Sequence, residues 1–216
     1  MEKNNSKVIA VVALVVAVVA LSVGFATYSA TLTITNTTAT INPANTFSEN
    51  VKYKASTMSC TPSTNASVVS AGTVSDTVWN GVQVTLTAPG DSVTCQATVQ
   101  NSSAFVAYLR NITTSSTISC AAGTGTGAAS TTNVAAVCPG MELTITAGGS
   151  TATATSTAAA SQAVTGTTGN TIAAISGTTP GEATVSFTIT YKNDAQAADG
   201  SIVVTLPQMN LIYETA

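Results

Sequence analysis

Apolar and polar residues alternate one by one in several short stretches of the chain. The first such stretch carries Tyr28, Ala30, Leu32 and Ile34, separated by Ser and Thr. The same alternation recurs in residues 82–86, 93–99, 143–146, 151–155 and 185–191. Successive side chains of a strand point to opposite sides of a sheet, so this pattern predicts strands with one apolar and one hydroxyl-bearing face. Antiparallel sheets with one face in water have strands of this kind.

Turn-forming sequences separate the predicted strands. They are Asn80-Gly81, Ala88-Pro89-Gly90-Asp91, Asn101-Ser102-Ser103, Pro139-Gly140, Thr179-Pro180-Gly181-Glu182 and Asp199-Gly200. Many short strands with frequent turns predict an all-β fold, here a single two-sheet β-sandwich of the jelly-roll or immunoglobulin-like kind over residues 27–216. Residues 121–133 and 147–176 are low in complexity and are expected to form long loops or edge hairpins. Residues 158–164 could form a helical turn, but the alternation in the preceding residues 151–155 favours an edge strand.

The N-terminal segment, residues 1–26, has the layout of an export signal. Lys3 and Lys7 precede an uncharged apolar run over residues 8–26, which predicts an apolar signal helix. Gly24 and Ala26 are small enough for the −3 and −1 pockets of a signal peptidase, so we expect cleavage after Ala26. The run approaches the ~20 residues that span a bilayer, and an uncleaved membrane anchor stays open as the alternative. We therefore expect an extracellular or cell-surface protein that contacts the membrane only through residues 8–26 before processing.

The charged residues exclude several functions. The chain has six Lys+Arg, nine Asp+Glu and no His, and only 7% of its residues are charged. Nucleic-acid binding needs a basic surface that displaces counterions from phosphates, and this chain has none. Without His, the commonest general base and neutral metal ligand is missing. Asp194 and Asp199 could offer oxygen atoms to calcium, but the spacing of a calcium loop is absent. We predict no catalytic residue, no metal and no cofactor, and hence a protein that is not an enzyme.

The four cysteines fit an exported protein, because an even number of cysteines in a secreted chain favours disulfides. Four cysteines allow three pairings, and the sequence alone does not choose among them. We favour Cys60–Cys95 and Cys120–Cys138, since the second pair would close a loop rich in Gly, Ala and Ser. Trp79 is expected in the core or at the edge of the sandwich rather than on a carbohydrate-binding surface. Four Asn-x-Ser/Thr sequons in residues 27–216 make glycosylation an open question; they begin at Asn36, Asn65, Asn101 and Asn111.

Three segments together resemble the TasA/camelysin-type family of exported surface and biofilm-fibre proteins. The first is the signal followed at once by the strand Tyr28–Ile34 and then Asn36–Ile41. The second is Leu86-Thr87-Ala88-Pro89-Gly90-Asp91 with the strand and Asn101-Ser102-Ser103 after it, similar to a Leu-x-Pro-Gly-Asp unit of the family. In this segment Pro and Gly are expected to form the turn and Asp91 to cap it. The third is Pro180-Gly181-Glu182 before a strand. Camelysin is named as a metalloprotease, but this chain has no His, so protease chemistry is not implied.

The resemblance implies a jelly-roll subunit of a cell-surface fibre, pilus-like filament or biofilm matrix. It also implies assembly by strand donation, in which residues 27–41, with Tyr28, Ala30, Leu32 and Ile34 as the alternating apolar positions, fill a groove of the next subunit. The expected partners are copies of the chain itself or related surface subunits, and a head-to-tail contact of this kind builds a filament. Two alternatives stay open: residues 28–34 are the first strand of their own sandwich, or the protein is a membrane-tethered or monomeric adhesin.

Overall fold

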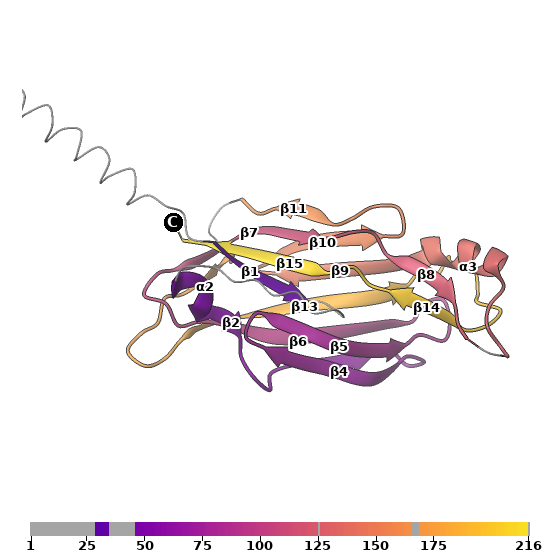
Figure 1. Cartoon of the computed structure of the whole chain (residues 1–216), viewed down its shortest axis with the longest axis horizontal. Coiled ribbons are helices and arrows are strands. Elements are labelled where there is room, and N and C mark those ends of the chain that lie inside the picture. Colours follow the sequence, from indigo (N-terminus) through magenta and orange to yellow (C-terminus); the bar gives the residue numbers. More distant parts are fainter. Residues whose placement is uncertain (1–28, 35–45, 125, 166–168, 216) are drawn as a thin grey trace, which may run out of the picture.

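The computed structural model describes residues 29–34, 46–124, 126–165 and 169–215. The signal helix, its cleavage residues Gly24 and Ala26, and Tyr28 lie outside the described residues. Within them the chain is all-β, with short strands rich in Thr and Val, residues that suit a pleated sheet. Two large sheets hold most of the strands and a third sheet holds two (Figure 1).

The larger sheet has seven strands and includes the first strand of the chain. Six of them lie in the order β11-β7-β15-β1-β5-β4, and β12 pairs with β7 beside β11. Their bounds are β1 (Ser29–Ile34), β4 (Ser67–Ser75), β5 (Val78–Thr85), β7 (Ala107–Thr114), β11 (Ser161–Ala163), β12 (Thr171–Ile172) and β15 (Met209–Glu214). All neighbours are antiparallel except β1 and β5, which run parallel over two residues.

The second sheet has six strands in the order β10-β9-β13-β6-β2, with β3 also pairing with β6. Their bounds are β2 (Val51–Tyr53), β3 (Ser59–Pro62), β6 (Ser92–Asn101), β9 (Met141–Ala147), β10 (Ser150–Thr155) and β13 (Gly181–Tyr191). The smallest sheet pairs β8 (Ser119–Ala122) with β14 (Ile202–Thr205). The helices are short: α2 (Thr46–Asn50), α3 (Thr131–Val137) and the 3₁₀ turn η1 (Cys138–Gly140).

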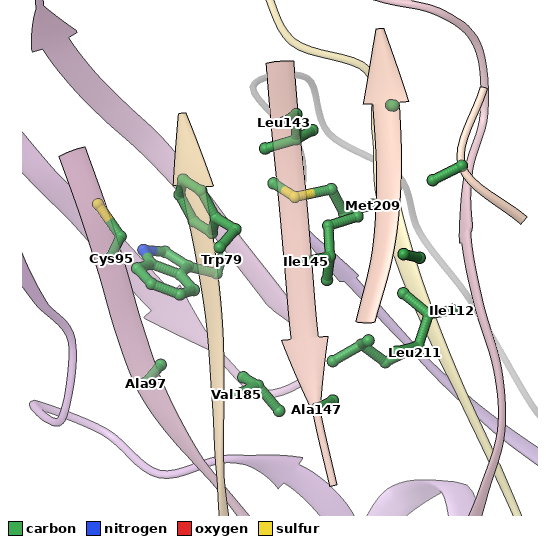
Figure 2. Packing of buried hydrophobic residues seen from close by; sticks show 14 of the residues in the cluster. Trp79, Cys95, Ala97, Ile112, Leu143, Ile145, Ala147, Val185, Met209 and Leu211 are labelled. Carbon is green, nitrogen blue, oxygen red and sulfur yellow. The ribbon is translucent and has the colours of Figure 1, made fainter. Parts of the chain in front are cut away.

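The core lies between the two large sheets, since strands of both contribute residues to one buried cluster, part of which Figure 2 shows. Trp79 of β5 is fully buried and its ring centroid lies 5.1 Å from that of Phe187 on the opposite sheet. Tyr53 meets the same tryptophan edge-on at 6.3 Å. Burial raises the pKa of the Tyr53 hydroxyl, and this hydroxyl has no hydrogen-bond partner among the described residues. The prediction that Trp79 belongs to the core is confirmed.

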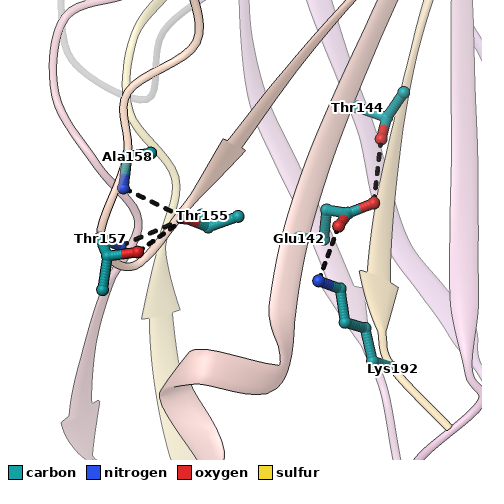
Figure 3. A network of polar contacts seen from close by, with 6 residues as sticks. All are labelled: Glu142, Thr144, Thr155, Thr157, Ala158 and Lys192. Carbon is teal, nitrogen blue, oxygen red and sulfur yellow. Dashed lines mark hydrogen bonds and ion pairs between the residues drawn. The ribbon is translucent and has the colours of Figure 1, made fainter.

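Hydroxyl groups and one ion pair satisfy polar groups at the ends of β9, β10 and β13 (Figure 3). Lys192 Nζ lies 2.8 Å from Glu142 Oε2, and this hydrogen bond raises the pKa of the lysine. The hydroxyl of Thr155 accepts the N–H groups of Thr157 and Ala158 at 3.3 and 3.1 Å, closing the turn after β10. Ion pairs as exposed as this one add little stability.

The predicted strands are confirmed where the structure describes them, including the edge strand over residues 151–155. Two expectations are wrong. Asn80-Gly81 is not a turn, because β5 continues through both residues while it pairs with β4. Gly81 lies opposite Gly72 of β4, and both glycines adopt positive φ within the paired strands. Residues 158–164 form no helical turn, because β11 pairs there with β7. The low-complexity residues 147–176 contain edge strands, as expected, whereas residues 121–133 lead into α3.

Candidate functional site

The first strand, β1, lies inside the larger sheet between two strands from distant parts of the chain. It pairs antiparallel with β15 along its whole length, from Ser29 opposite Glu214 to Ile34 opposite Met209. On its other side, Thr33 and Ile34 pair in parallel with Val78 and Trp79 of β5. In this structure the segment is therefore a strand of its own sandwich, which is one of the alternatives that the sequence left open. Donation to another chain is not tested by a single chain and stays a prediction.

The apolar positions of β1 lie opposite the core residues of β15. Ala30, Leu32 and Ile34 face register partners that are all buried, namely Tyr213, Leu211 and Met209. Because β15 and β5 are linked in the sheet only through β1, removing this strand would leave a slot one strand wide over the core. Both walls of the slot would then carry unpaired backbone groups, which is the arrangement that accepts an added strand.

Beyond the end of β1, the described residues border a groove of about 740 Å³. Its two walls are the continuation of β5 and the strand β14, which precedes β15 in the chain. Each wall contributes three partly buried aliphatic side chains that pack on the core: Val82, Val84 and Leu86 from one, and Ile202, Val204 and Leu206 from the other. The floor includes Met141, Ile189 and Tyr191 of the opposite sheet.

Neither wall of this groove has a strand partner on its groove side within the described residues. β5 pairs with β4 on one side and with β1 only at Val78 and Trp79. β14 pairs with β8 on one side only. The groove is therefore an apolar trench between two sheet edges, whose shape and hydrogen-bonding groups suit an extended peptide chain.

The β5 wall obtains its shape from the pair Gly72 and Gly81. Trp79 is buried, yet farther along β5 the inward residues are Val82 and Val84, so the inward side shifts by one position at Gly81. The indole N–H of Trp79 donates to the carbonyl of Ala71 at 2.9 Å, which fixes β4 against β5 at the same level. Positive φ at these two glycines is a conformation that other residues adopt only with strain.

Both disulfides are confirmed. Cys60 of β3 bonds to Cys95 of β6, its direct partner in the register. Cys120 of β8 bonds to Cys138 at the end of α3. The second bond thus ties the helix to the small sheet that forms one wall of the groove. Two disulfides are compatible with an oxidising, extracellular environment.

Two acidic side chains, Asp91 and Asp199, stabilise local structure. The buried Asp91 carboxylate accepts the N–H groups of Thr87 and Ala88 at 2.7 and 2.9 Å, confirming that Asp caps the Pro-Gly turn. Burial alone would raise the pKa of Asp91, but these hydrogen bonds and those from the Thr87 and Ser63 hydroxyls outweigh it and lower the pKa. Asp199 accepts the hydroxyl of Ser130 at the start of α3, at 3.0 Å. In the described part of the chain, no three Cys, Asp or Glu residues gather in a way that could hold a metal ion.

The fold buries the asparagine of one sequon and makes it inaccessible to glycosylation. Asn101 is fully buried at the end of β6. Its amide nitrogen donates to the carbonyls of Phe105, Ile172 and Ala173, and its oxygen accepts the N–H and hydroxyl of Ser103. A glycan on this nitrogen would displace those contacts, so Asn101 serves as a structural link between β6 and the chain near β12. Asn65 is exposed.

The β14 wall of the groove is the functional feature that the strand pattern could have revealed but did not. Ile202, Val204 and Leu206 are separated by Val203 and Thr205, which is a weaker strand signal than the others because Val203 is itself apolar. Across residues 46–124, 126–165 and 169–215, and in β1, no helix is long and apolar enough to span a membrane.

No protein-family model, no curated protein and no solved structure matches the chain.

Proposed function

We propose that this protein is an exported structural subunit of a cell-surface fibre, pilus-like filament or biofilm matrix, and that it assembles by β-strand donation. The observation that carries the proposal is the position of β1, which alone bridges β15 and β5 in the larger sheet. A strand in this place can come from the same chain or from another copy, because the slot and the strand are identical in every copy.

Exchange of β1 between copies preserves every contact that the strand makes within one chain. Such a swap is therefore a low-cost route to association. Since the donated strand and the slot are different surfaces, the contact is head-to-tail and does not close on itself, so the product is a filament. Copies of the chain, or related surface subunits with the same slot, are the partners.

The proposal includes the jelly-roll arrangement, an N-terminal signal helix cleaved after Ala26, and a role without catalysis. Its support is the agreement of several independent features. The apolar run over residues 8–26 is typical of export, two disulfides suit an oxidising environment, and the low charge leaves a hydroxyl-rich surface. Once residues 8–26 are removed, the segment that contains β1 is no longer tied to the membrane.

The test is electron microscopy of the exported chain and of two matched variants. Leu32→Asp places a charge at a position opposite the buried Leu211, whereas Thr31→Asp places it at the next position, opposite the partly exposed Ile212. We expect filaments from the unchanged chain and from Thr31→Asp, and none from Leu32→Asp. N-terminal sequencing of the exported chain establishes the cleavage site.

A second arm uses a chain that lacks residues 27–35. This chain should form no filaments, and a synthetic peptide of residues 27–41 should bind to it and raise its unfolding temperature. A monodisperse, folded monomer from the unchanged chain at all concentrations would refute the proposal and favour the adhesin alternative.

A further inference from the structure

The outer surface of the six-stranded sheet carries hydroxyl groups that the strand register aligns into rows. Successive side chains of each strand point to opposite sides, as in β9, where Leu143 and Ile145 are buried and Thr144 and Thr146 are not. One row crosses five neighbouring strands and consists only of threonine: Thr153, Thr144, Thr188, Thr94 and Thr61, each the register partner of the next.

A second row lies beside the first, two residues away along every strand. It consists of Thr151, Thr146, Ser186, Gln96 and Ser59. We call the two rows together the hydroxyl face. It presents nine hydroxyl groups and one amide, and none of its ten side chains is buried.

Contacts between the strands hold these hydroxyl groups in place. The hydroxyl oxygens of Thr94 and Thr188 lie 2.9 Å apart, and those of Thr146 and Thr151 lie 3.3 Å apart. Threonine is also branched at Cβ, which restricts its side-chain rotation in a strand. The hydroxyl face is therefore ordered before any ligand arrives, and an ordered surface loses little conformational entropy on binding.

The charged side chains of this sheet lie at the two ends of the hydroxyl face. Within the described strands of the sheet, they are Glu142 at one end and Glu182 and Lys52 at the other. Glu142 is paired with Lys192 at 2.8 Å (Figure 3). A charged ligand would thus find no counter-charge in either row.

The hydroxyl face also lacks the rings on which sugars stack. The aromatic residues of the six described strands are Tyr53, Phe187 and Tyr191, and all three are buried on the core side. What remains is one chemical group repeated at regular intervals, which donates and accepts hydrogen bonds at every position. Such a surface suits a ligand that is itself a regular lattice of hydroxyl-like oxygens.

The intervals agree with those of crystalline water. Neighbouring strands lie about 4.8 Å apart, and alternate residues of an antiparallel strand lie about 6.8 Å apart. Water molecules that are bonded tetrahedrally at an oxygen–oxygen distance of about 2.75 Å have second neighbours at about 4.5 Å, and the hexagonal lattice that they build repeats along its long axis every ~7.3 Å. Each strand interval lies within about a tenth of the corresponding water interval.

We propose that the hydroxyl face binds ice. Its threonine hydroxyls hydrogen-bond to a layer of water that continues the crystal lattice, and its methyl groups order the water between them. A single hydrogen bond contributes little net free energy, but the groups of a rigid face bind together, so the bound protein leaves the crystal slowly. Copies fixed on an ice surface stop its growth between them and lower the freezing temperature below the melting temperature. This role is independent of strand donation, since β1 belongs to the other large sheet.

The test measures the gap between the melting and freezing temperatures of a single ice crystal in a solution of the exported chain. Thr188→Tyr places a bulky ring in the middle of the threonine row. Thr113→Tyr places the same ring on β7 of the other large sheet, at an outward position between the buried Ile112 and Thr114. Tyrosine suits a strand at both positions. We expect a clear gap for the unchanged chain and for Thr113→Tyr, and loss of most of it for Thr188→Tyr.

A second pair of variants avoids the centre of the sheet, where a bulky substitution could disturb folding. Thr153→Lys places a charge in the threonine row on the edge strand β10, and Thr73→Lys places one on the edge strand β4 of the other sheet; both threonines are exposed. We expect a smaller gap for Thr153→Lys and an unchanged gap for Thr73→Lys. The unfolding temperature of each variant, measured in parallel, identifies any variant that does not fold.

Partition of the chain into slowly grown polycrystalline ice gives an independent measurement of binding. We expect enrichment of the unchanged chain in the ice. No enrichment and no temperature gap would overturn the proposal, and equal gaps within both matched pairs of variants would overturn the assignment to the hydroxyl face. Binding to microcrystalline chitin or cellulose without enrichment in ice would overturn it as well, because the ligand would then be a polysaccharide.

Discussion

Replacement of Gly72 or Gly81 by Ala tests the local structure that shapes the β5 wall of the groove. The two glycines lie opposite each other and have similar φ, +79° and +72°. They differ in what an added Cβ would meet. At Gly81 its nearest neighbour would be the Cα of Gly72 at 3.8 Å, an ordinary contact. At Gly72 it would overlap the carbonyl oxygen of Asn80 and press on Trp79 and Val82 at 3.0 Å.

These contacts give different costs for the same substitution. Positive φ costs a residue with a Cβ about 1–2 kcal/mol, and both variants bear this term. Gly72→Ala must in addition displace backbone and core side chains, which costs about 1–3 kcal/mol. We therefore expect Gly81→Ala to lower the free energy of unfolding by about 1–2 kcal/mol and Gly72→Ala by about 2–5 kcal/mol.

The assay is urea unfolding followed by tryptophan fluorescence. The chain has one tryptophan, and Trp79 lies beside both glycines, so its emission reports the affected region. Thermal unfolding provides a second measurement, in which each kcal/mol corresponds to about 2–4 °C for a domain of this size. Equal losses in the two variants would refute the steric part of the reasoning, and no loss in either would refute the strained backbone at this level of β4 and β5.

Four further predictions concern stability. Tyr53→Phe removes a buried hydroxyl without a described partner, so the free energy of unfolding should stay equal or rise by about 1 kcal/mol; a clear loss in urea unfolding would contradict this. Replacing Cys120 and Cys138 by Ser opens a loop with a separation of 18 residues and should cost about 3 kcal/mol, measured against the unchanged chain. Asn101→Asp puts a carboxylate beside three carbonyls and should cost at least about 2 kcal/mol; a neutral effect on the unfolding midpoint would exclude the described network. The pKa of Asp91 is lowered in the folded chain, so its contribution is complete above the ordinary value of about 3.9 and is lost as pH falls through the folded value; Asp91→Asn should flatten the decline of the urea midpoint in that acid range.

The sequence by itself determined the class of the fold and the position of most strands. Alternation of apolar residues with Thr in segments such as 93–99 and 185–191 is a local property, because neighbouring side chains of a strand necessarily face opposite sides. The capping role of Asp91 was likewise visible, since it depends on a turn of a few residues. The disulfide pairing was predicted correctly from compartment and loop composition, although three pairings were open.

The tertiary structure alone decided which strands are neighbours and where a groove lies between them. No local pattern says that β1 lies between β15 and β5, because that choice depends on pairings between residues far apart in the chain. The same holds for Gly81, which resembles a turn residue until Gly72 is placed opposite it, and for Asn101, whose sequon is closed by carbonyls from residues 105, 172 and 173. The groove exists only because two edges, from β5 and β14, meet over the core without a strand between them within the described residues. Its walls are formed by residues more than a hundred positions apart in the sequence, and only folding brings them together.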